Sequence, residues 1–244
     1  MIKRSTSPPS NASFARTPSS EGSHEGNTVP IACLHTAESN IAVYEAAAEA
    51  LGLPAGALRH HVRADLLLAA EQAGRLTEEI TAETAALLWH LAEDADAVVL
   101  NCSTLGPAVS KAAAGAAAPI IRADAMLADE AVQAGGKVIV LCTVETTITP
   151  TTALFEAAAR ATGAEIEVRL IPGAWTHFRA GDLPAYLAAI ADAVQAANRE
   201  GSVTVALAQA SMTDATRLLP EKCPRPMSGP TTALKAAMAR SVIR

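Results

Sequence analysis

The strongest candidate for chemistry in the sequence is a cysteine that ends an apolar run and is followed by two hydroxyl residues. Residues 98–100 lead into Asn101, Cys102, Ser103 and Thr104, and a Gly-Pro pair and an alanine-rich segment follow. This pattern is typical of a buried parallel strand that leads into a helix. A helix N-terminus carries unpaired N–H groups and partial positive charge, which favour an anion or a thiolate. The stretch therefore predicts a carboxylate site beside a reactive sulfur.

Three other apolar runs, near residues 29–34, 137–141 and 203–207, also end in small polar residues. The candidates that follow these runs are, in chain order, His35, Thr36, Ser39, Cys142, Thr143, Thr146, Gln209 and Ser211. Strand ends of this kind meet at one edge of a doubly wound sheet, so they predict a single cleft lined by strand carboxyl ends. Because the runs to Cys102 and Cys142 are alike, we interpret them as marks of two similar lobes.

Composition narrows the function classes. The 244 residues, half of them hydrophobic, suit one large domain or two small lobes. A net charge of −6 without a basic run excludes nucleic acid as a partner, and no stretch reaches the roughly 20 apolar residues of a membrane span. The four cysteines lack regular spacing, which predicts reduced thiols in the cytoplasm. The aromatic content of 3% favours a small aliphatic or amino-acid-like ligand.

Residues 1–28 are rich in serine, proline, asparagine and glycine, and we expect a disordered extension there. After it, strands and helices alternate, which predicts an α/β protein with parallel sheets. We expect a loop at 172–178. Strands are predicted at 30–35, 58–62, 98–102, 119–122, 137–142, 165–170 and 203–208, and helices at 41–51, 66–73, 77–95, 107–117, 124–134, 152–161, 183–198 and 230–240.

The histidines and the remaining cysteines are weaker candidates. His60 and His61 are adjacent on a predicted strand and point to opposite faces, with no cysteine or third histidine at ligand spacing, so we expect no metal site. His177 is predicted to be an ordinary loop residue. Cys33 is expected in the core and Cys223 in an exposed loop.

Three stretches resemble the aspartate/glutamate/hydantoin racemase superfamily, which includes arylmalonate decarboxylases and maleate isomerases. VVLNCSTLGPAV is similar to the loop of the first catalytic cysteine, and VIVLCTVETTITPT to the turn that holds the substrate carboxylate. VALAQASM stands where the family places its second catalytic cysteine. The resemblance runs from about residue 29 to the C-terminus. It implies two Rossmann-like lobes related by a pseudo-twofold axis, with the active site between them and no cofactor.

By this resemblance, residues 29–122 and 213–244 form the first lobe and residues 123–212 the second. Cys102 matches the catalytic cysteine. The matches to substrate-binding positions are Thr36, Ser39, Ser103, Thr104, Thr143, Thr146, Gln209 and Ser211. Two departures matter, because Gln209 replaces the second cysteine and His35 replaces the acidic residue of the first strand. His35 is either a second acid–base group or a hydrogen-bonded positioning residue, and Cys142 is either the missing partner or a small buried residue.

Three functions remain, in order of preference. The first is an isomerase, a cofactor-independent racemase that acts at the carbon next to a carboxylate, with Cys102 as acid–base and His35, Cys142 or water returning the proton. The second is a single-cysteine lyase of the arylmalonate decarboxylase type. The third is a non-catalytic protein that binds small carboxylates. For all three we expect a small carboxylate as ligand, no nucleic acid or membrane partner, and an oligomeric state left open.

Overall fold

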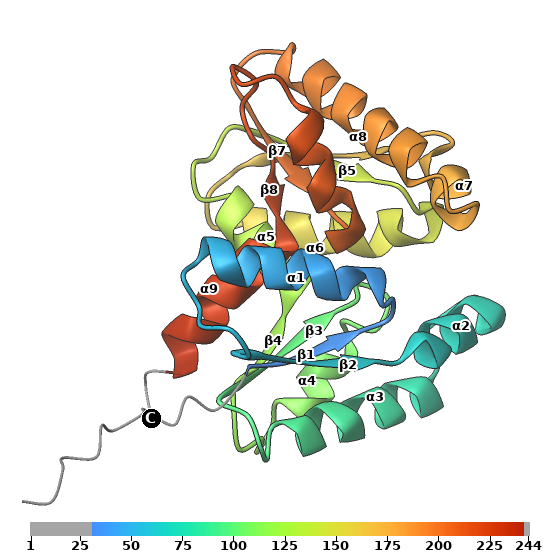
Figure 1. Cartoon of the computed structure of the whole chain (residues 1–244), viewed down its shortest axis with the longest axis vertical. Helices are drawn as coiled ribbons and strands as arrows, with labels where there is room; N and C mark the ends of the chain where they lie inside the picture. The colour runs from blue at the N-terminus through green and yellow to red at the C-terminus, as the bar shows by residue number, and fades with distance from the viewer. Residues whose placement is uncertain (1–30, 242–244) are drawn as a thin grey trace, which may run out of the picture.

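Two four-stranded parallel sheets organise residues 31–241, the part of the chain that the computed structural model describes (Figure 1). The predicted disordered extension, residues 1–28, lies outside the described residues. The first sheet has the order β2-β1-β3-β4 and the second β6-β5-β7-β8. The strands are β1 Ile31–His35, β2 Leu58–Val62, β3 Ala97–Asn101, β4 Ile120–Arg122, β5 Lys137–Cys142, β6 Glu165–Leu170, β7 Val203–Leu207 and β8 Met227–Ser228.

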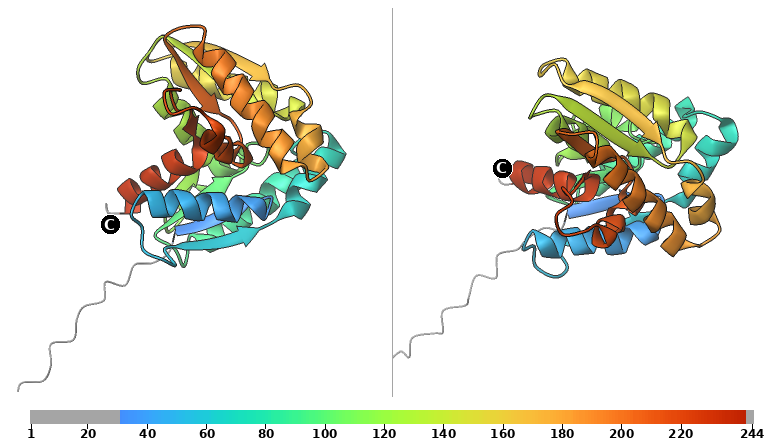
Figure 2. Two further views of the ribbon diagram at one scale, coloured as in Figure 1. Left: turned by 45° about the horizontal axis from the view of Figure 1, so that its top comes forward. Right: turned by 90° about the horizontal axis from the view of Figure 1, so that it is seen from above.

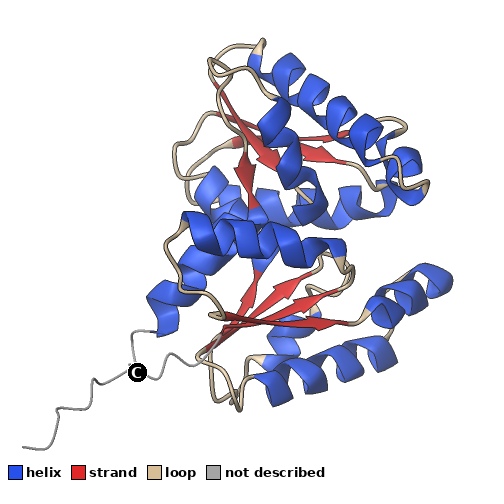
Figure 3. Cartoon of the chain, in the orientation of Figure 1, coloured by secondary structure: helices blue, strands red, loops and turns tan. Residues whose placement is uncertain are grey.

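Helices separate the strands, as the alternation in the sequence predicts (Figure 3). The α/β class and the parallel sheets are confirmed. The helices are α1 Ser39–Ala50, α2 Ala64–Ala73, α3 Glu78–Leu91, α4 Ala108–Ala112, α5 Ala123–Ala131, α6 Ile148–Ala159, α7 Ala174–Arg179, α8 Leu183–Asn198 and α9 Gly229–Ser241, with 3₁₀ helices η1 Glu145–Thr147 and η2 Ala210–Leu218. None of the helices within 31–241 has the length and hydropathy needed to cross a bilayer.

The two sheets have the same topology, because adding four to each strand number of the first sheet gives the order of the second. β5 is therefore the counterpart of β1, and β7 the counterpart of β3. Cys142 ends β5 and so corresponds to His35, while Gln209, just after β7, corresponds to the position of Cys102. The two similar lobes that these runs predict are confirmed, although the two cysteines end strands at different positions of the two sheets. Similar residues at two strand ends do not reveal strand order, which depends on pairing.

Each sheet is covered on both faces, which explains why its central strands are almost entirely apolar. In the first sheet, α1 and α9 cover the face toward the second lobe and α2, α3 and α4 cover the other (Figures 1 and 2). In the second sheet, α8 and η2 cover one face, and α5 and α6 the other. Alanine allows the helices to approach closely, and the bulk of the core comes from a few large buried residues such as Tyr44, Phe155 and Tyr186.

The chain returns from the second sheet to the first lobe near its C-terminal end. β8 pairs with β7 in the second sheet, although residues 213–244 are predicted for the first lobe. The following helix, α9, packs on β3 and α1 of the first lobe and on α5. The predicted segment therefore divides, with β8 in the second sheet and α9 on the first.

Several predicted element boundaries are wrong, for local reasons. α4 ends at Ala112 instead of 117, and Gly115 beyond it adopts φ +77°, a left-handed conformation that a helix cannot contain. α6 begins at Ile148 instead of 152, because Pro150 fits the first turn, where its missing N–H is not needed. The predicted loop at 172–178 contains α7.

Candidate active site

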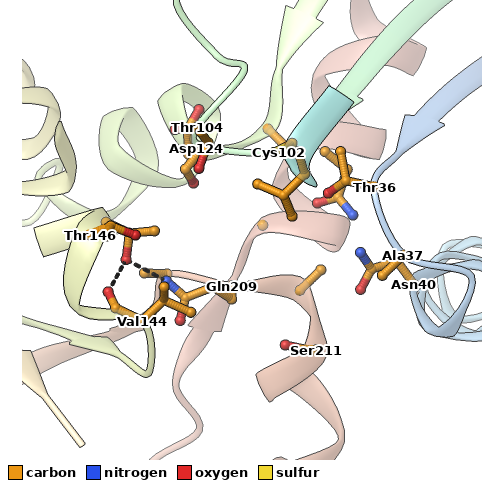
Figure 4. Close-up of a pocket in the computed structure, with 18 of the residues that line it drawn as sticks. Thr36, Ala37, Asn40, Cys102, Thr104, Asp124, Val144, Thr146, Gln209 and Ser211 are labelled. Atoms are coloured by element: carbon orange, nitrogen blue, oxygen red, sulfur yellow. Dashed lines mark hydrogen bonds between the residues drawn. The ribbon is translucent and has the colours of Figure 1, made fainter. Parts of the chain in front are cut away.

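The carboxyl ends of β1 and β3 face those of β5 and β7 across one cavity of about 120 Å³ (Figure 4). Both strand pairs lie where the strand order reverses, which is where doubly wound sheets bind ligands. Both lobes contribute residues to the lining of the cavity, and its volume suits a small molecule. The predicted site residues that line the cavity are Thr36, Cys102, Ser103, Thr104, Thr146, Gln209 and Ser211.

Four predicted site residues do not line this cavity. Ser39 is exposed in the first turn of α1, and Thr143 is buried behind Gln209. His35 and Cys142 have no exposed surface. Each of the four lies next to a lining residue in the sequence or in space. Polar residues at strand ends therefore predicted the region of the cavity, and the direction of each side chain determines whether it reaches the cavity.

Cys102 follows β3 and is partly buried at the centre of the cavity wall (Figure 4). Burial raises the pKa of its thiol, and this outweighs the lowering by hydrogen bonds from the Thr36 hydroxyl and from the backbone N–H groups of Leu105 and Thr104. The sequence predicts a lowered pKa from a helix N-terminus. The direction is the opposite because burial outweighs these donors, and α4, only five residues long, begins several residues beyond the sulfur. The raised pKa favours the neutral thiol, which is the form that can donate a proton.

Gln209 ties together the loops after β5 and β7. Its Oε1 accepts hydrogen bonds from the backbone N–H of Thr143 at 2.9 Å and from the Thr143 hydroxyl at 3.2 Å. Its Nε2 donates to the Thr147 hydroxyl at 3.2 Å (Figure 4). The amide oxygen thus occupies donors of the turn that the resemblance assigns to a carboxylate. Thr146 remains on the cavity surface.

Cys142 lies behind this network. Burial raises the pKa of its thiol, while hydrogen bonds with Thr147, Thr151 and Gln209 lower it to a lesser extent. A thiol held among hydroxyl groups, with no exposed surface, is in the environment of a packed residue. The other two cysteines are Cys33, fully buried on β1, and Cys223, partly exposed after η2.

His35 is the centre of a buried hydrogen-bonded chain. Its Nε2 lies 2.9 Å from Nδ1 of His60, and its Nδ1 lies 3.2 Å from Nδ2 of Asn101. Nε2 of His60 lies 2.9 Å from the carboxylate of Glu45 on α1. Burial, with the nearby histidines, lowers the pKa of His35 to about 3. The sequence leaves two roles open for His35, a second acid–base group or a hydrogen-bonded positioning residue, and these contacts match the positioning role.

This lowered pKa predicts a stability that falls with falling pH. Between pH 6.5 and about 3 the unfolded chain binds a proton at His35 that the folded chain does not, so acid favours unfolding. We expect His35 to reduce the free energy of unfolding by about 2 kcal/mol between pH 7 and pH 5. Urea unfolding at both pH values should show a smaller pH dependence in His35→Gln. The exposed His177→Gln is the control, and equal pH dependence in both variants would contradict the prediction.

Five polar lining residues were not among the predicted site residues: Asn40, Glu71, Asn101, Asp124 and Thr147. Asn40 in α1 is 8% exposed and its Oδ1 has no hydrogen-bond partner, so the cavity offers an unsatisfied acceptor. Asp124 at the start of α5 receives two hydrogen bonds from Arg122, at 2.6 and 2.8 Å. A Cβ at Gly106 would lie 2.3 Å from Nε of Arg122, so glycine is needed for this pair. No sequence signal other than a position at a helix start marks Asn40 and Asp124.

Aromatic residues also line the cavity, which the low aromatic content did not predict. Trp175 and Phe178 of α7 stack with ring centroids 5.0 Å apart. They shape one wall, so the composition argument for a purely aliphatic ligand loses its basis. A second cavity of about 570 Å³ shares Ser103, Thr104, Thr146 and Trp175 with the first. Two arginines and two glutamates also line it, so its formal charge favours neither anions nor cations; they are Arg75, Arg179, Glu71 and Glu145.

The structure also corrects the spacing argument about metals. Cys33, His35 and His60 each place one potential ligand atom within 4.8 Å of the others. The sequence places no cysteine or third histidine near His60, but β1 and β2 pair in register, so that Cys33 lies directly beside His60. His61 lies on the opposite face, where Arg59 and His90 influence its pKa, as the alternation of strand side chains predicts.

Comparisons with known proteins agree on one family and one fold. The sequence profile described as Asp/Glu/hydantoin racemase matches residues 31–238. No curated protein sequence matches the chain. Among solved structures, an aspartate racemase from Picrophilus torridus superposes with a TM-score of 0.67 at 10% identity, covering 88% of this chain and 94% of that one. An allantoin racemase from Klebsiella pneumoniae gives 0.58 at 16% identity, covering 86% of each chain.

Proposed function

The chain belongs to the Asp/Glu/hydantoin racemase family, and from that premise we propose that it is a cofactor-independent racemase or isomerase that moves a proton at the carbon next to a carboxylate or carbonyl of a small molecule. Cys102 is the proposed acid–base residue. The observation that carries the proposal is the position of Cys102, which faces the cavity between the lobes at the end of β3 with hydrogen-bond donors around its sulfur.

The reaction requires stabilisation of an enediolate-like anion, which forms when the carbon loses its proton. Preorganised N–H and hydroxyl donors supply this stabilisation most effectively in a site that excludes water. The cavity offers the hydroxyl groups of Thr36, Ser103, Thr104 and Thr146, and no lysine, arginine or histidine is among the described residues that line it. Among the lining side chains, Cys102, Glu71 and Asp124 can transfer a proton, and Cys102 is the one that we assign to the carbon beside the bound anion.

A second candidate, a single-cysteine lyase, is favoured by one observation. Burial raises the pKa of the Cys102 thiol and so favours its neutral form, and Gln209 at the counterpart position cannot transfer a proton. Decarboxylation of a disubstituted malonate generates the carbanion without a base, so one neutral thiol suffices to protonate it. A racemase with this inventory needs a water molecule or a carboxylate such as Asp124 for the opposite face of the carbon.

Proton exchange in D2O tests the proposal. The protein is incubated separately with L-α-amino acids, L-α-hydroxy acids and 5-substituted hydantoins, and ¹H NMR follows the α-proton while optical rotation follows the configuration. We expect loss of the α-proton together with racemisation in one class. Release of CO2 from a disubstituted malonate without exchange in the other compounds supports the lyase. Binding without exchange or CO2 release would overturn both and leave a binding protein.

A further inference from the structure

Glu45, His60, His35 and Asn101 connect the protein surface to the cavity, and nothing in the proposed chemistry uses them. Half of the Glu45 side chain is exposed on α1, His60 is on β2, His35 ends β1 and Asn101 ends β3. His35 and Asn101 are register partners of the β1–β3 pair, so their side chains leave the sheet on the same face, beneath α1. Asn101 lines the cavity next to Cys102.

While His60 is neutral, the carboxylate at one end fixes the direction of every hydrogen bond in this chain. An ionised carboxylate can only accept, so Nε2 of His60 carries the proton on the bond to Glu45. A neutral His60 then has a bare Nδ1, which accepts from Nε2–H of His35. The bare Nδ1 of His35 in turn accepts from Nδ2 of Asn101. The amide of Asn101 therefore has only one orientation that satisfies the chain.

We propose that Glu45, His60 and His35 are positioning residues that hold the Asn101 carboxamide with its nitrogen on His35, so that its oxygen is a fixed hydrogen-bond acceptor for the ligand beside Cys102. Within the described residues, Oδ1 of Asn101 has no hydrogen-bond partner of its own, which leaves it free for a ligand. The lowered pKa of His35 agrees with this arrangement, because the ring stays neutral over the working range of pH. The contact with substrate rests on the proposed function, whereas the orientation of the amide does not.

A metal ion is the competing explanation for these histidines, and their geometry decides against it. The ring centroids of His35 and His60 are 5.1 Å apart with an interplanar angle of 27°, and their nitrogens are 2.9 Å apart. The line between the nitrogens therefore runs close to both ring centres, so each ring points at the other nitrogen. Zinc on that line needs two bonds of about 2.0–2.1 Å, which is more than the available separation. A hydrogen bond fits without movement of either ring.

The tautomers of the histidines test the proposal without any substrate, so its failure is distinguishable from failure of the proposed function. Long-range ¹H–¹⁵N NMR of the ¹⁵N-labelled full chain is recorded at pH 8, above the usual histidine pKa of about 6.5. We expect His35 and His60 to be neutral Nε2–H tautomers. In Asn101→Asp, which has nearly the same shape, the carboxylate can only accept. We expect His35 to switch to the doubly protonated ring, with Nδ1–H donated to the new carboxylate and Nε2–H still donated to His60.

Asn198→Asp is the matched control, because it introduces the same charge at a residue that bonds Cys223 and Pro224 instead. It should leave both ring patterns unchanged. An Nδ1–H tautomer of His35 in the wild type, or no switch in Asn101→Asp, would overturn the proposal. Zinc chloride is added to the wild type as a second arm. Stoichiometric binding of zinc that shifts the ¹⁵N signals of both histidine rings would also overturn the proposal and identify a metal site. Unchanged signals support the proposal.

Discussion

Replacement of Cys102 by serine is expected to abolish proton exchange at the α-carbon while the ligand still binds. The hydroxyl of serine is a far weaker acid than a thiol, and a positioned acid–base group contributes typically 10²–10⁴-fold to the rate. The side chains are similar in size, so the hydroxyl groups of Thr36, Ser103 and Thr104 around the position stay in place. The measurement is the exchange rate in D2O with the substrate class found for the wild type, together with the Kd from calorimetry.

Cys223→Ser is the control for this variant. Cys223 is a partly exposed cysteine far from the cavity lining, so its loss should leave exchange unchanged. Exchange that persists in Cys102→Ser at the wild-type rate would exclude Cys102 as the acid–base residue. A loss of both exchange and binding would show that the sulfur holds the ligand in addition to transferring its proton.

Replacement of Arg122 by alanine is expected to cost about 3 kcal/mol of the free energy of unfolding, because it leaves Asp124 charged and unpaired. The side chains of Arg122 and Asp124 are 19% and 11% exposed, so water cannot fully replace the lost partner. The double variant Arg122→Ala/Asp124→Ala removes both charges and should recover much of the loss. Urea unfolding of the wild type, both single variants and the double variant measures the coupling.

The chain offers a matched pair for this experiment. Arg63 and Asp65 have the same two-residue spacing and the same double hydrogen bond at the start of α2, but their side chains are 30% and 63% exposed. Arg63 also pairs with Glu83, which is 57% exposed. Arg63→Ala should therefore destabilise far less than Arg122→Ala, because exposed ion pairs contribute little. Equal losses of the free energy of unfolding in Arg63→Ala and Arg122→Ala would contradict the role of burial. If the double variant recovers no stability, the unpaired charge of Asp124 is not the cause of the loss.

The predictable part of this protein is its strands and the chemistry at their ends. The strand at 58–62 and the helix at 183–198 match the structure residue for residue, because apolar periodicity and turn residues define both locally. The strand at 165–170 alternates charged and apolar residues, and β6 is the outer strand of its sheet. Cys102 was located for the same reason, since a run of buried residues ends at that point.

What the sequence did not predict depends on contacts between distant segments. The position of Cys33 beside His60 requires the register of β1 and β2, which no local pattern encodes. The pKa of Cys102 has the opposite direction to the prediction, because burial is a property of the folded lobes and outweighs nearby donors. Asn40 and Asp124 are polar residues at helix starts, and only the meeting of the two lobes places them in a cavity.

The return of α9 to the first lobe also affects the order in which the chain can fold during synthesis. Leu234 and Ala237 of α9 share a core with Val99 of β3 and Tyr44 of α1, yet the ribosome adds α9 well over a hundred residues after β3. During that interval the face of the first sheet that α1 and α9 share lacks the part of its cover that α9 supplies. Nascent chains generally fold domain by domain from the N-terminus, and exposed apolar surface promotes aggregation. In this protein the lobe that is translated second is the first that can be completed.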